Sequence, residues 1–298
     1  MIINHNNRFD YNRGINGRSI IMKIALFNEN RVGVVDGSNV IDITELTTWN
    51  NEEPQSSLVE LMGEFEDLKP KIEAGLGSCP VYPVSDVALC APVPNPSKIV
   101  AAPINYILHK QEMNTALTVD RLGFFLKSPS SIIGPGQTVL LPFKDRRVDH
   151  EAEIAFVIGK EAKDVKAEDA SKYIFGYLAL MDITVRGKED RPWRKSFDTF
   201  TPIGPWIVTD DEVENPNQLQ MNLWVNDEIR QSANTRDLIY DCYKFFEAAS
   251  SVMTLLPGDI VTTGTPEGVA PITKGDTVRI HIERIGEFSV QVDNKPGV

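Results

Sequence analysis

Apolar residues recur along most of this chain in short runs bounded by turn residues, and many of these runs alternate with a period of two, which is typical of β-strands. Residues 22–46 alternate like a small antiparallel unit, with a hairpin turn at Asp36-Gly37. Further strands are expected at 98–102, 124–127, 138–141, 151–158, 177–184, 202–208, 219–225, 228–230, 260–263, 277–282 and 288–292.

Helical periodicity is clearest in three segments. Short helices are predicted from Ser57 to Phe65 and from Lys69 to Leu76. A longer apolar stripe runs from Leu238 to Met253, and Thr235 is placed to cap that helix. Strands outnumber helices, so the pattern predicts an α+β fold that is mainly β.

Prolines accumulate from Pro80 to Pro96, and this composition is typical of a linker. We therefore expect a domain boundary near residue 95, with a small N-terminal α/β domain at 22–95 and a larger domain at 96–298. Residues 1–21 are rich in Asn and Arg and lack periodicity, which predicts a flexible extension. A mitochondrial presequence is the alternative for this segment, because it carries arginines and few acids.

Composition narrows the classes of partner. The chain has 298 residues and a net charge of −12, which argues against nucleic acids and anionic membranes as partners. No apolar run is long enough to span a bilayer. The cysteines at 79, 90 and 242 are odd in number and scattered, so they read as free thiols in a reducing, cytoplasmic compartment.

Acidic residues interrupt two of the most apolar predicted strands. Glu151 and Glu153 share one face of a strand that is apolar on both sides, and Asp182 interrupts the run at 177–184. Three carboxylates at the rim of a core favour a hard divalent cation, because Mg²⁺, Mn²⁺ and Ca²⁺ prefer oxygen ligands. The alternative is a solvated strand face for the two glutamates, with Asp182 paired to Arg186.

Two further groups of residues are candidates for chemistry. His109 and Glu112 stand three apart, so on a helical turn the carboxylate can orient the imidazole as a general base; a surface ion pair is the alternative. Lys127, Arg186 and Lys195 supply positive charge for an anionic substrate, unless they are solvated surface residues.

Four motifs, in this order, resemble the fumarylacetoacetate hydrolase family over roughly residues 97–292. They are His150 to Gly159, Met181 to Arg186, Lys195 to Asp198, and Pro257 to Asp259 with Thr263 to Val269. The resemblance implies a catalytic domain built as a mixed β-sandwich or β-roll, following a small N-terminal domain. It also implies a homodimer and Mg²⁺ or Mn²⁺ held by Glu151, Glu153 and Asp182.

The resemblance further implies roles for other residues. It makes His109 and Glu112 a water-activating dyad on a lid segment, and it makes Lys195 a catalytic contact near the metal. Glu189 stands where many hydrolytic members carry Gln, so an acid replaces an amide there. The expected substrate contacts are Tyr106, Lys127, Arg186, Glu189, Gly264 and Thr265.

These residues predict an Mg²⁺- or Mn²⁺-dependent hydrolase that binds a small 2-oxo acid. It would cleave the carbon–carbon bond of an acylpyruvate such as fumarylpyruvate or maleylpyruvate, giving pyruvate and a carboxylic acid. The alternative is an oxaloacetate-type decarboxylase, or an isomerase or lyase of a related 2-oxo acid. A third hypothesis is a non-catalytic β-domain with a structural ion.

Overall fold

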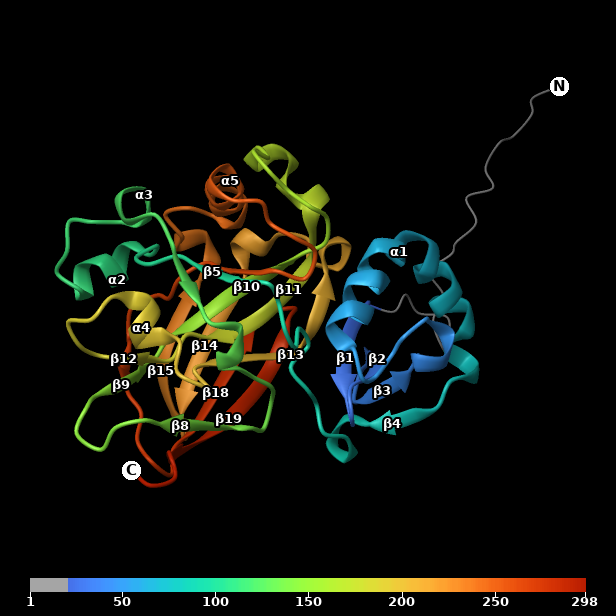
Figure 1. Cartoon of the computed structure of the whole chain (residues 1–298), viewed down its shortest axis with the longest axis horizontal. Coiled ribbons are helices and arrows are strands. Elements are labelled where there is room, and N and C mark those ends of the chain that lie inside the picture. The colour runs from blue at the N-terminus through green and yellow to red at the C-terminus, as the bar shows by residue number, and fades with distance from the viewer. Residues whose placement is uncertain (1–20) are drawn as a thin grey trace.

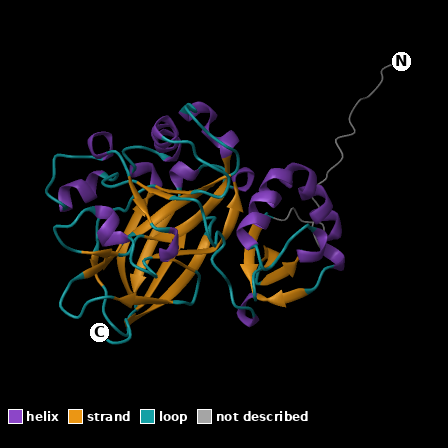
Figure 2. Ribbon diagram, viewed as in Figure 1, coloured by secondary structure: helices purple, strands orange, loops and turns teal. Residues whose placement is uncertain are grey.

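The computed structural model describes residues 21–298, so the predicted N-terminal extension lies outside the described residues except for Ile21. Figure 1 shows a large strand-rich body beside a smaller unit that contains α1 and β1–β4. Figure 2 shows that the strands form the interior of the larger body and that short helices lie around it. This arrangement agrees with the predicted α+β, mainly β fold.

The largest sheet has eleven strands in the order β4-β3-β2-β1-β13-β11-β10-β16-β5-β6, and β7 pairs with β13. Its strands are β1 (Lys23–Phe27), β2 (Arg31–Asp36), β3 (Asn39–Asp42), β4 (Val81–Pro83), β5 (Ile99–Ala101), β6 (Phe125–Lys127), β7 (Ile132–Ile133), β10 (Ala152–Ile158), β11 (Ile174–Met181), β13 (Thr201–Thr209) and β16 (Ile260–Thr262).

A second sheet of five strands follows the order β15-β14-β18-β19-β8, and a third of three strands follows β12-β9-β17. Their members are β8 (Thr138–Leu141), β9 (Val148–His150), β12 (Thr184–Val185), β14 (Gln220–Val225), β15 (Glu228–Asn234), β17 (Ala270–Pro271), β18 (Thr277–Ile282) and β19 (Gly286–Asn294). The helices are α1 (Pro54–Gly75), α2 (Ile107–Glu112), α3 (Val119–Leu122), α4 (Arg191–Lys195) and α5 (Cys242–Val252).

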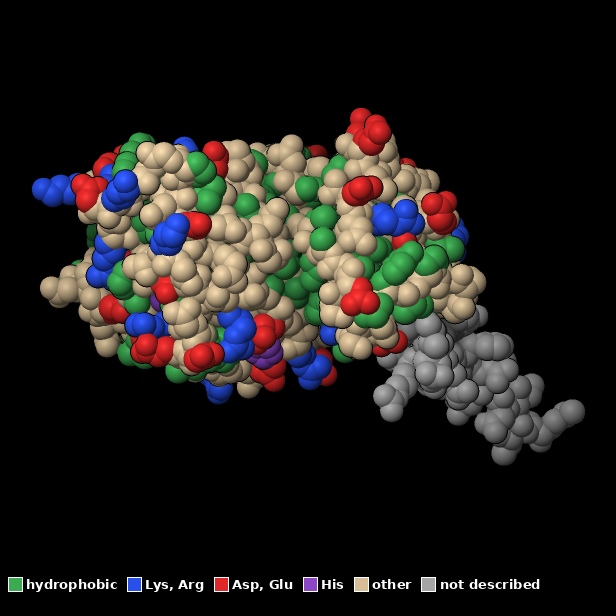
Figure 3. All heavy atoms as spheres, turned by 90° about the horizontal axis from the view of Figure 1, so that it is seen from below, with side chains coloured by type: hydrophobic (Ala, Val, Ile, Leu, Met, Phe, Trp, Pro, Cys, Tyr) green, Lys and Arg blue, Asp and Glu red, His purple; other side chains and the backbone are tan. Residues whose placement is uncertain are grey.

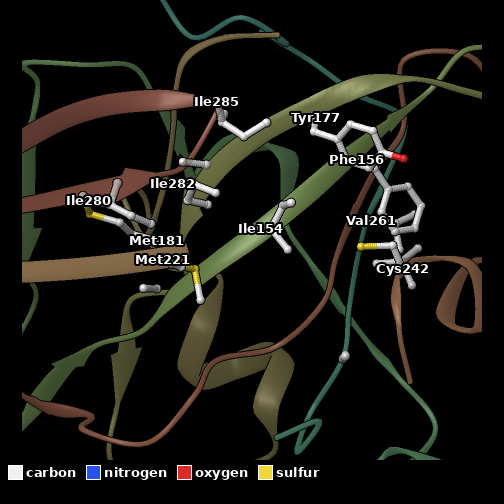
Figure 4. Close-up of a cluster of buried hydrophobic side chains, with 14 of the residues drawn as sticks. Ile154, Phe156, Tyr177, Met181, Met221, Cys242, Val261, Ile280, Ile282 and Ile285 are labelled. Carbon is white, nitrogen blue, oxygen red and sulfur yellow. The ribbon is translucent and has the colours of Figure 1, made fainter. Parts of the chain in front are cut away.

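Strand β10 is covered on both faces, as its apolar pattern predicts. Ile154 and Phe156 join the core of the larger body, where Met221 of β14 and Ile280 of β18 also lie (Figure 4). Ala155 and Val157, on the opposite face, join a second core that includes the buried residues of α1. A strand with two buried faces is held rigidly, which suits it to carry site residues.

The small N-terminal unit shares the largest sheet with the larger body. Strand β1 pairs antiparallel with β13, with Lys23 opposite Val208 and Ile24 opposite Ile207. The ring of Phe65 on α1 also meets Phe175 edge-on, with centroids 5.0 Å apart. The sheet therefore runs without interruption across the predicted boundary near residue 95.

Two helix predictions need correction. The predicted helices at 57–65 and 69–76 are one helix, α1, with Pro70 inside it. Proline inside a helix removes one backbone hydrogen bond and disfavours its continuation. The apolar stripe that includes Leu61, Leu68 and Ile72 is buried on both sides of this position, and that burial outweighs the loss.

The helix predicted after Thr235 begins later, at Cys242, and its N-cap is Asp241, whose Oδ1 accepts the Lys244 N–H at 2.8 Å. Residues 238–240 stay outside it because Asn105 binds their backbone: Ile239 N–H donates to the Asn105 carbonyl, and Tyr240 N–H donates to its Oδ1, both at 2.7 Å. No helix within residues 21–298 is long and apolar enough to cross a membrane.

Candidate metal centre and substrate site

The three predicted acids meet where β10 and β11 run side by side. Ala152 pairs with Met181 across the two strands, which places Glu151 beside Asp182, and the Asp182 N–H donates to the Glu151 carbonyl at 2.8 Å. One carboxylate oxygen from each of Glu151, Glu153 and Asp182 lies within 4.8 Å of the others, and all three residues are buried. The alternative of a solvated strand face is therefore wrong.

The electrostatics of this carboxylate triad fit a divalent cation. Burial, together with the neighbouring Asp182 charge, raises the pKa of Glu153 to about 8. Burial also opposes ionisation of Glu151, but Lys195 and Arg186 outweigh it and lower the pKa of Glu151 to about 2. A cation bound between the three acids would keep Glu153 ionised, and an all-oxygen donor set is the one that Mg²⁺ and Mn²⁺ prefer.

Two buried lysines contact the triad. The Lys195 ammonium group donates to Glu151 Oε2 at 2.7 Å, to Thr184 Oγ1 at 2.7 Å, and to Asp182. The Lys127 ammonium group donates to Asp182 and, at 2.9 Å, to the Phe200 carbonyl. With all three acids ionised, the positive charges of Lys127, Lys195 and Arg186 balance the charge of the triad. A divalent cation would make the centre positive, and the centre would then attract an anion.

Arg186 does not pair with Asp182, contrary to the alternative considered from the sequence. Its Nε donates to Asp149 at 2.6 Å and its guanidinium reaches Glu151 Oε1 at 2.9 Å. Asp149 is fully buried and was missed by the sequence reasoning. Asp149 lies two residues before Glu151, just as Glu151 lies two residues before Glu153, and this alternation could have identified it.

The His109–Glu112 pair forms on α2, as its spacing predicts. The His109 Nδ1 lies 2.9 Å from Glu112 Oε2, and the imidazole is only 5% exposed. The ring lies near enough to Glu151 to contribute to the lowered pKa of that carboxyl. The other Glu112 oxygen accepts the Gly268 N–H at 3.0 Å. The imidazole is thus buried near the triad, and the partly exposed Glu112 carboxylate also binds the loop at Gly268, so the pair is more than the surface ion pair of the alternative.

The Gly264–Thr265 segment also contacts the carboxylate triad. The Gly264 N–H donates to Glu153 Oε2 at 2.9 Å, and its φ of +88° is a conformation that favours glycine. Thr265 Oγ1 accepts from the Gln231 amide at 2.8 Å, and Gln231 Oε1 accepts the Ala152 N–H at 2.9 Å. The sequence analysis missed Gln231, because its position in a hairpin does not indicate that its side chain connects two other elements.

Tyr106 and Glu189, two of the expected substrate contacts, form no hydrogen bond to the carboxylate triad within residues 21–298. Tyr106 is buried, and its hydroxyl has no hydrogen-bond partner in the part of the chain that the structure describes. Glu189 is exposed, and both its oxygens bind the Arg146 guanidinium, at 2.9 and 2.8 Å. The negative charge of Glu189 is therefore neutralised by a neighbouring cation.

Comparisons with known proteins identify the family. Residues 98–293 match the family model described as the C-terminal region of fumarylacetoacetate hydrolase. A maleylpyruvate hydrolase from Aquipseudomonas alcaligenes is 45% identical over 91% of this chain and 99% of its own. A mitochondrial oxaloacetate tautomerase from Bos taurus is 36% identical over 84% of this chain and 83% of its own.

A solved structure of maleylpyruvate hydrolase from Sphingobium sp. SYK-6, in complex with manganese(II) and pyruvate, is also similar. It has a TM-score of 0.84 and 45% identity, covering 92% of this chain and 99% of that one. The chain therefore belongs to the fumarylacetoacetate hydrolase family.

Proposed function

We propose that this protein is a metal-dependent hydrolase that cleaves an acylpyruvate to pyruvate and a carboxylic acid. The observation that carries the proposal is the convergence of an imidazole–carboxylate dyad on a buried triad of carboxylates. Maleylpyruvate hydrolases at 45% identity over nearly the whole chain support the substrate class.

We assign Glu151, Glu153 and Asp182 as ligands of Mg²⁺ or Mn²⁺. When bound, the cation would supply a Lewis acid for the keto oxygen of the substrate and would offset negative charge on the departing fragment. The Gly264 N–H and Lys195 fix the directions of the carboxylates, because the first donates to Glu153 and the second to both Glu151 and Asp182. The metal site is therefore preorganised by the protein itself.

The dyad has the geometry of a general base. Glu112 accepts from Nδ1 of His109, which leaves Nε2 free to take a proton. His109 would remove a proton from water as that water attacks the distal carbonyl of the acylpyruvate. The carbon–carbon bond then breaks, its electron pair leaves with the pyruvate fragment as an enolate, and that fragment takes up a proton. The acyl group departs as a carboxylic acid.

Lys195 and Arg186 balance charge during this reaction. Both face the triad, and Lys195 donates hydrogen bonds to two of its members. An ammonium group fixed in a buried site stabilises a developing enolate without reorganising during the step. Tyr106, Lys127, Glu189 and Thr265 remain proposed substrate contacts.

The assay uses fumarylpyruvate and maleylpyruvate with the purified protein, in the presence of Mn²⁺, Mg²⁺ or EDTA. The proposal expects enol absorbance to fall and one pyruvate to form per substrate, only with metal. Oxaloacetate is the matched second substrate, because a relative is an oxaloacetate tautomerase. Turnover of oxaloacetate without hydrolysis of either acylpyruvate would refute the proposal and favour the alternative 2-oxo acid chemistry.

We also propose a homodimer in the cytoplasm. Exposed apolar side chains of Val81 and Tyr82 on the edge strand β4 support an association surface, and three free cysteines fit a reducing compartment. Acidic and basic side chains are interspersed over the face in Figure 3, which argues against nucleic acid as a partner there. Light scattering tests the oligomer: a mass equal to one chain would contradict the dimer.

A further inference from the structure

A cavity of about 270 Å³ opens between the segment before α2, the end of α3, strand β6 and helix α4. Its apolar walls are Pro103, Leu122, Phe124 and Phe125. Phe125 connects the cavity to the metal centre, because the Lys195 ammonium group lies 5.4 Å from the centroid of its ring. Figure 1 shows α2, α3 and α4 gathered at this one end of the larger body.

Arg191 is the cationic residue lining this cavity. It precedes Lys195 by four residues on α4, so the two side chains share one face of the helix, about 6 Å apart along its axis. Lys195 contacts the triad and Arg191 contacts the cavity. A short carbon chain held at the triad by one end would therefore reach Arg191 with the other.

The guanidinium of Arg191 is partly buried yet has no hydrogen-bond or ion-pair partner among residues 21–298. Neighbouring arginines of the same segment are satisfied: Arg186 binds Asp149 and Glu151, and Arg194 donates to the Glu189 carbonyl at 2.7 Å. Asp190 also lines the cavity but forms no ion pair with Arg191. Burial, followed by the nearby Arg194 charge, lowers the pKa of Arg191, and the Glu151 and Asp190 charges offset this lowering only in part.

We infer that Arg191 binds a carboxylate at the far end of the acyl group, which makes dicarboxylic acylpyruvates the preferred substrates. This inference rests on the proposed function and names the substrate class of that site. A guanidinium binds a carboxylate through two parallel hydrogen bonds, and the apolar walls formed by Phe124 and Phe125 would exclude water from the connecting chain.

The binding test uses two ligands that differ only in the distal carboxylate and carry no 4-oxo group. Calorimetry with Mn²⁺-loaded protein compares 2-oxoadipate with 2-oxohexanoate. Wild type is expected to bind 2-oxoadipate about 10- to 100-fold more tightly, as a charge-assisted hydrogen bond predicts. In Arg191→Gln this preference should disappear while the affinity for 2-oxohexanoate stays the same.

Lys188→Gln is the matched control, because it removes one positive charge from an exposed position of the same loop. It should keep the preference for 2-oxoadipate. Circular dichroism melting of each variant verifies folding. Equal affinities of wild type for the two ligands, or an equal loss of both in Arg191→Gln, would overturn the inference.

A kinetic test separates this inference from the proposed function. Arg191→Gln should lower kcat/KM for maleylpyruvate about 10- to 100-fold and leave kcat/KM for acetylpyruvate within about twofold. If wild type hydrolyses both substrates and Arg191→Gln loses neither selectively, Arg191 has no such role and the hydrolase assignment stands. If wild type hydrolyses no acylpyruvate, the hydrolase assignment fails and calorimetry alone decides the role of Arg191.

Discussion

Glu153 and Glu151 carry pKa shifts of opposite sign, so replacing each with glutamine should change the stability of the metal-free protein in opposite directions. The folded state raises the pKa of Glu153 from 4.5 to about 8. Between these pH values the unfolded chain releases this proton and the folded chain keeps it, so metal-free stability falls as pH rises. Converted to free energy, this pKa shift gives an upper bound of about 5 kcal/mol for the loss of stability. Relaxation of the protein around the buried charge reduces the expected loss to about 2–3 kcal/mol.

The variant Glu153→Gln removes this cost and retains an oxygen that can accept from Thr262 and from the Gly264 N–H. At pH 8 in EDTA it should therefore be more stable than wild type by about 2–3 kcal/mol, and its stability should depend less on pH between 5 and 8. Urea denaturation at pH 5 and at pH 8, monitored by tryptophan fluorescence, measures both effects.

Glu151→Gln is the matched control. The folded state lowers the pKa of Glu151 to about 2, so this carboxylate stabilises the fold above pH 4.5 and loses that effect as pH falls toward 2. Removing its charge at pH 8 takes one carboxylate partner from Lys195 and one from Arg186 and should cost about 2–3 kcal/mol.

Both variants should lose most of the stabilisation that Mn²⁺ gives to wild type, which is about 2.7 kcal/mol at a free metal concentration of one hundred times Kd. If Glu153→Gln is no more stable than wild type in EDTA at pH 8, or if both glutamines destabilise equally, the assignment of opposite shifts is wrong. Retention of full Mn²⁺ stabilisation by both variants would exclude the triad as the metal site.

Three further predictions concern other contacts. Glu112→Gln should lower kcat for an acylpyruvate about 10²- to 10⁴-fold with Mn²⁺ affinity retained, because the carboxylate orients His109 rather than the metal ligands; an unchanged kcat by steady-state kinetics would refute this role. Gln231→Leu breaks the contacts to Ala152 and Thr265 and should destabilise the protein by about 2–4 kcal/mol, since several buried partners lose their hydrogen bonds; urea denaturation measures this, and an unchanged midpoint would contradict the bridging role. Asp241→Ala should lower the free energy of unfolding by about 1 kcal/mol without affecting metal binding, and no change in thermal melting would argue against its role as helix cap.

The parts of the site that the sequence predicted share a local origin. The alternation of Glu151 and Glu153 within an apolar strand fixes their common face, and the three-residue spacing of His109 and Glu112 fixes their contact. Both follow from the geometry of one element. The pairing of β10 with β11, which brings Asp182 to the other acids, follows from neighbouring strands with only one connection between them.

The missed parts arise from contacts between distant segments. Gln231 bridges β10 and the loop after β16. The residues next to Gln231 in the sequence do not indicate which distant segments its side chain will contact. Asn105 likewise delays the start of α5 by binding the backbone of residues 239 and 240, more than 130 positions away. The helix that continues through Pro70 has the same cause, because tertiary burial of its apolar stripe outweighs local propensity.

The hydrogen bonds between β1 and β13 have a mechanical consequence. Two units that share one sheet, with the side chains of α1 interlocked against the same strands, cannot rotate as separate rigid bodies without breaking backbone pairs. The N-terminal unit therefore acts as a fixed support behind the strands that bear the acids, and access of a substrate to the site does not depend on its rotation.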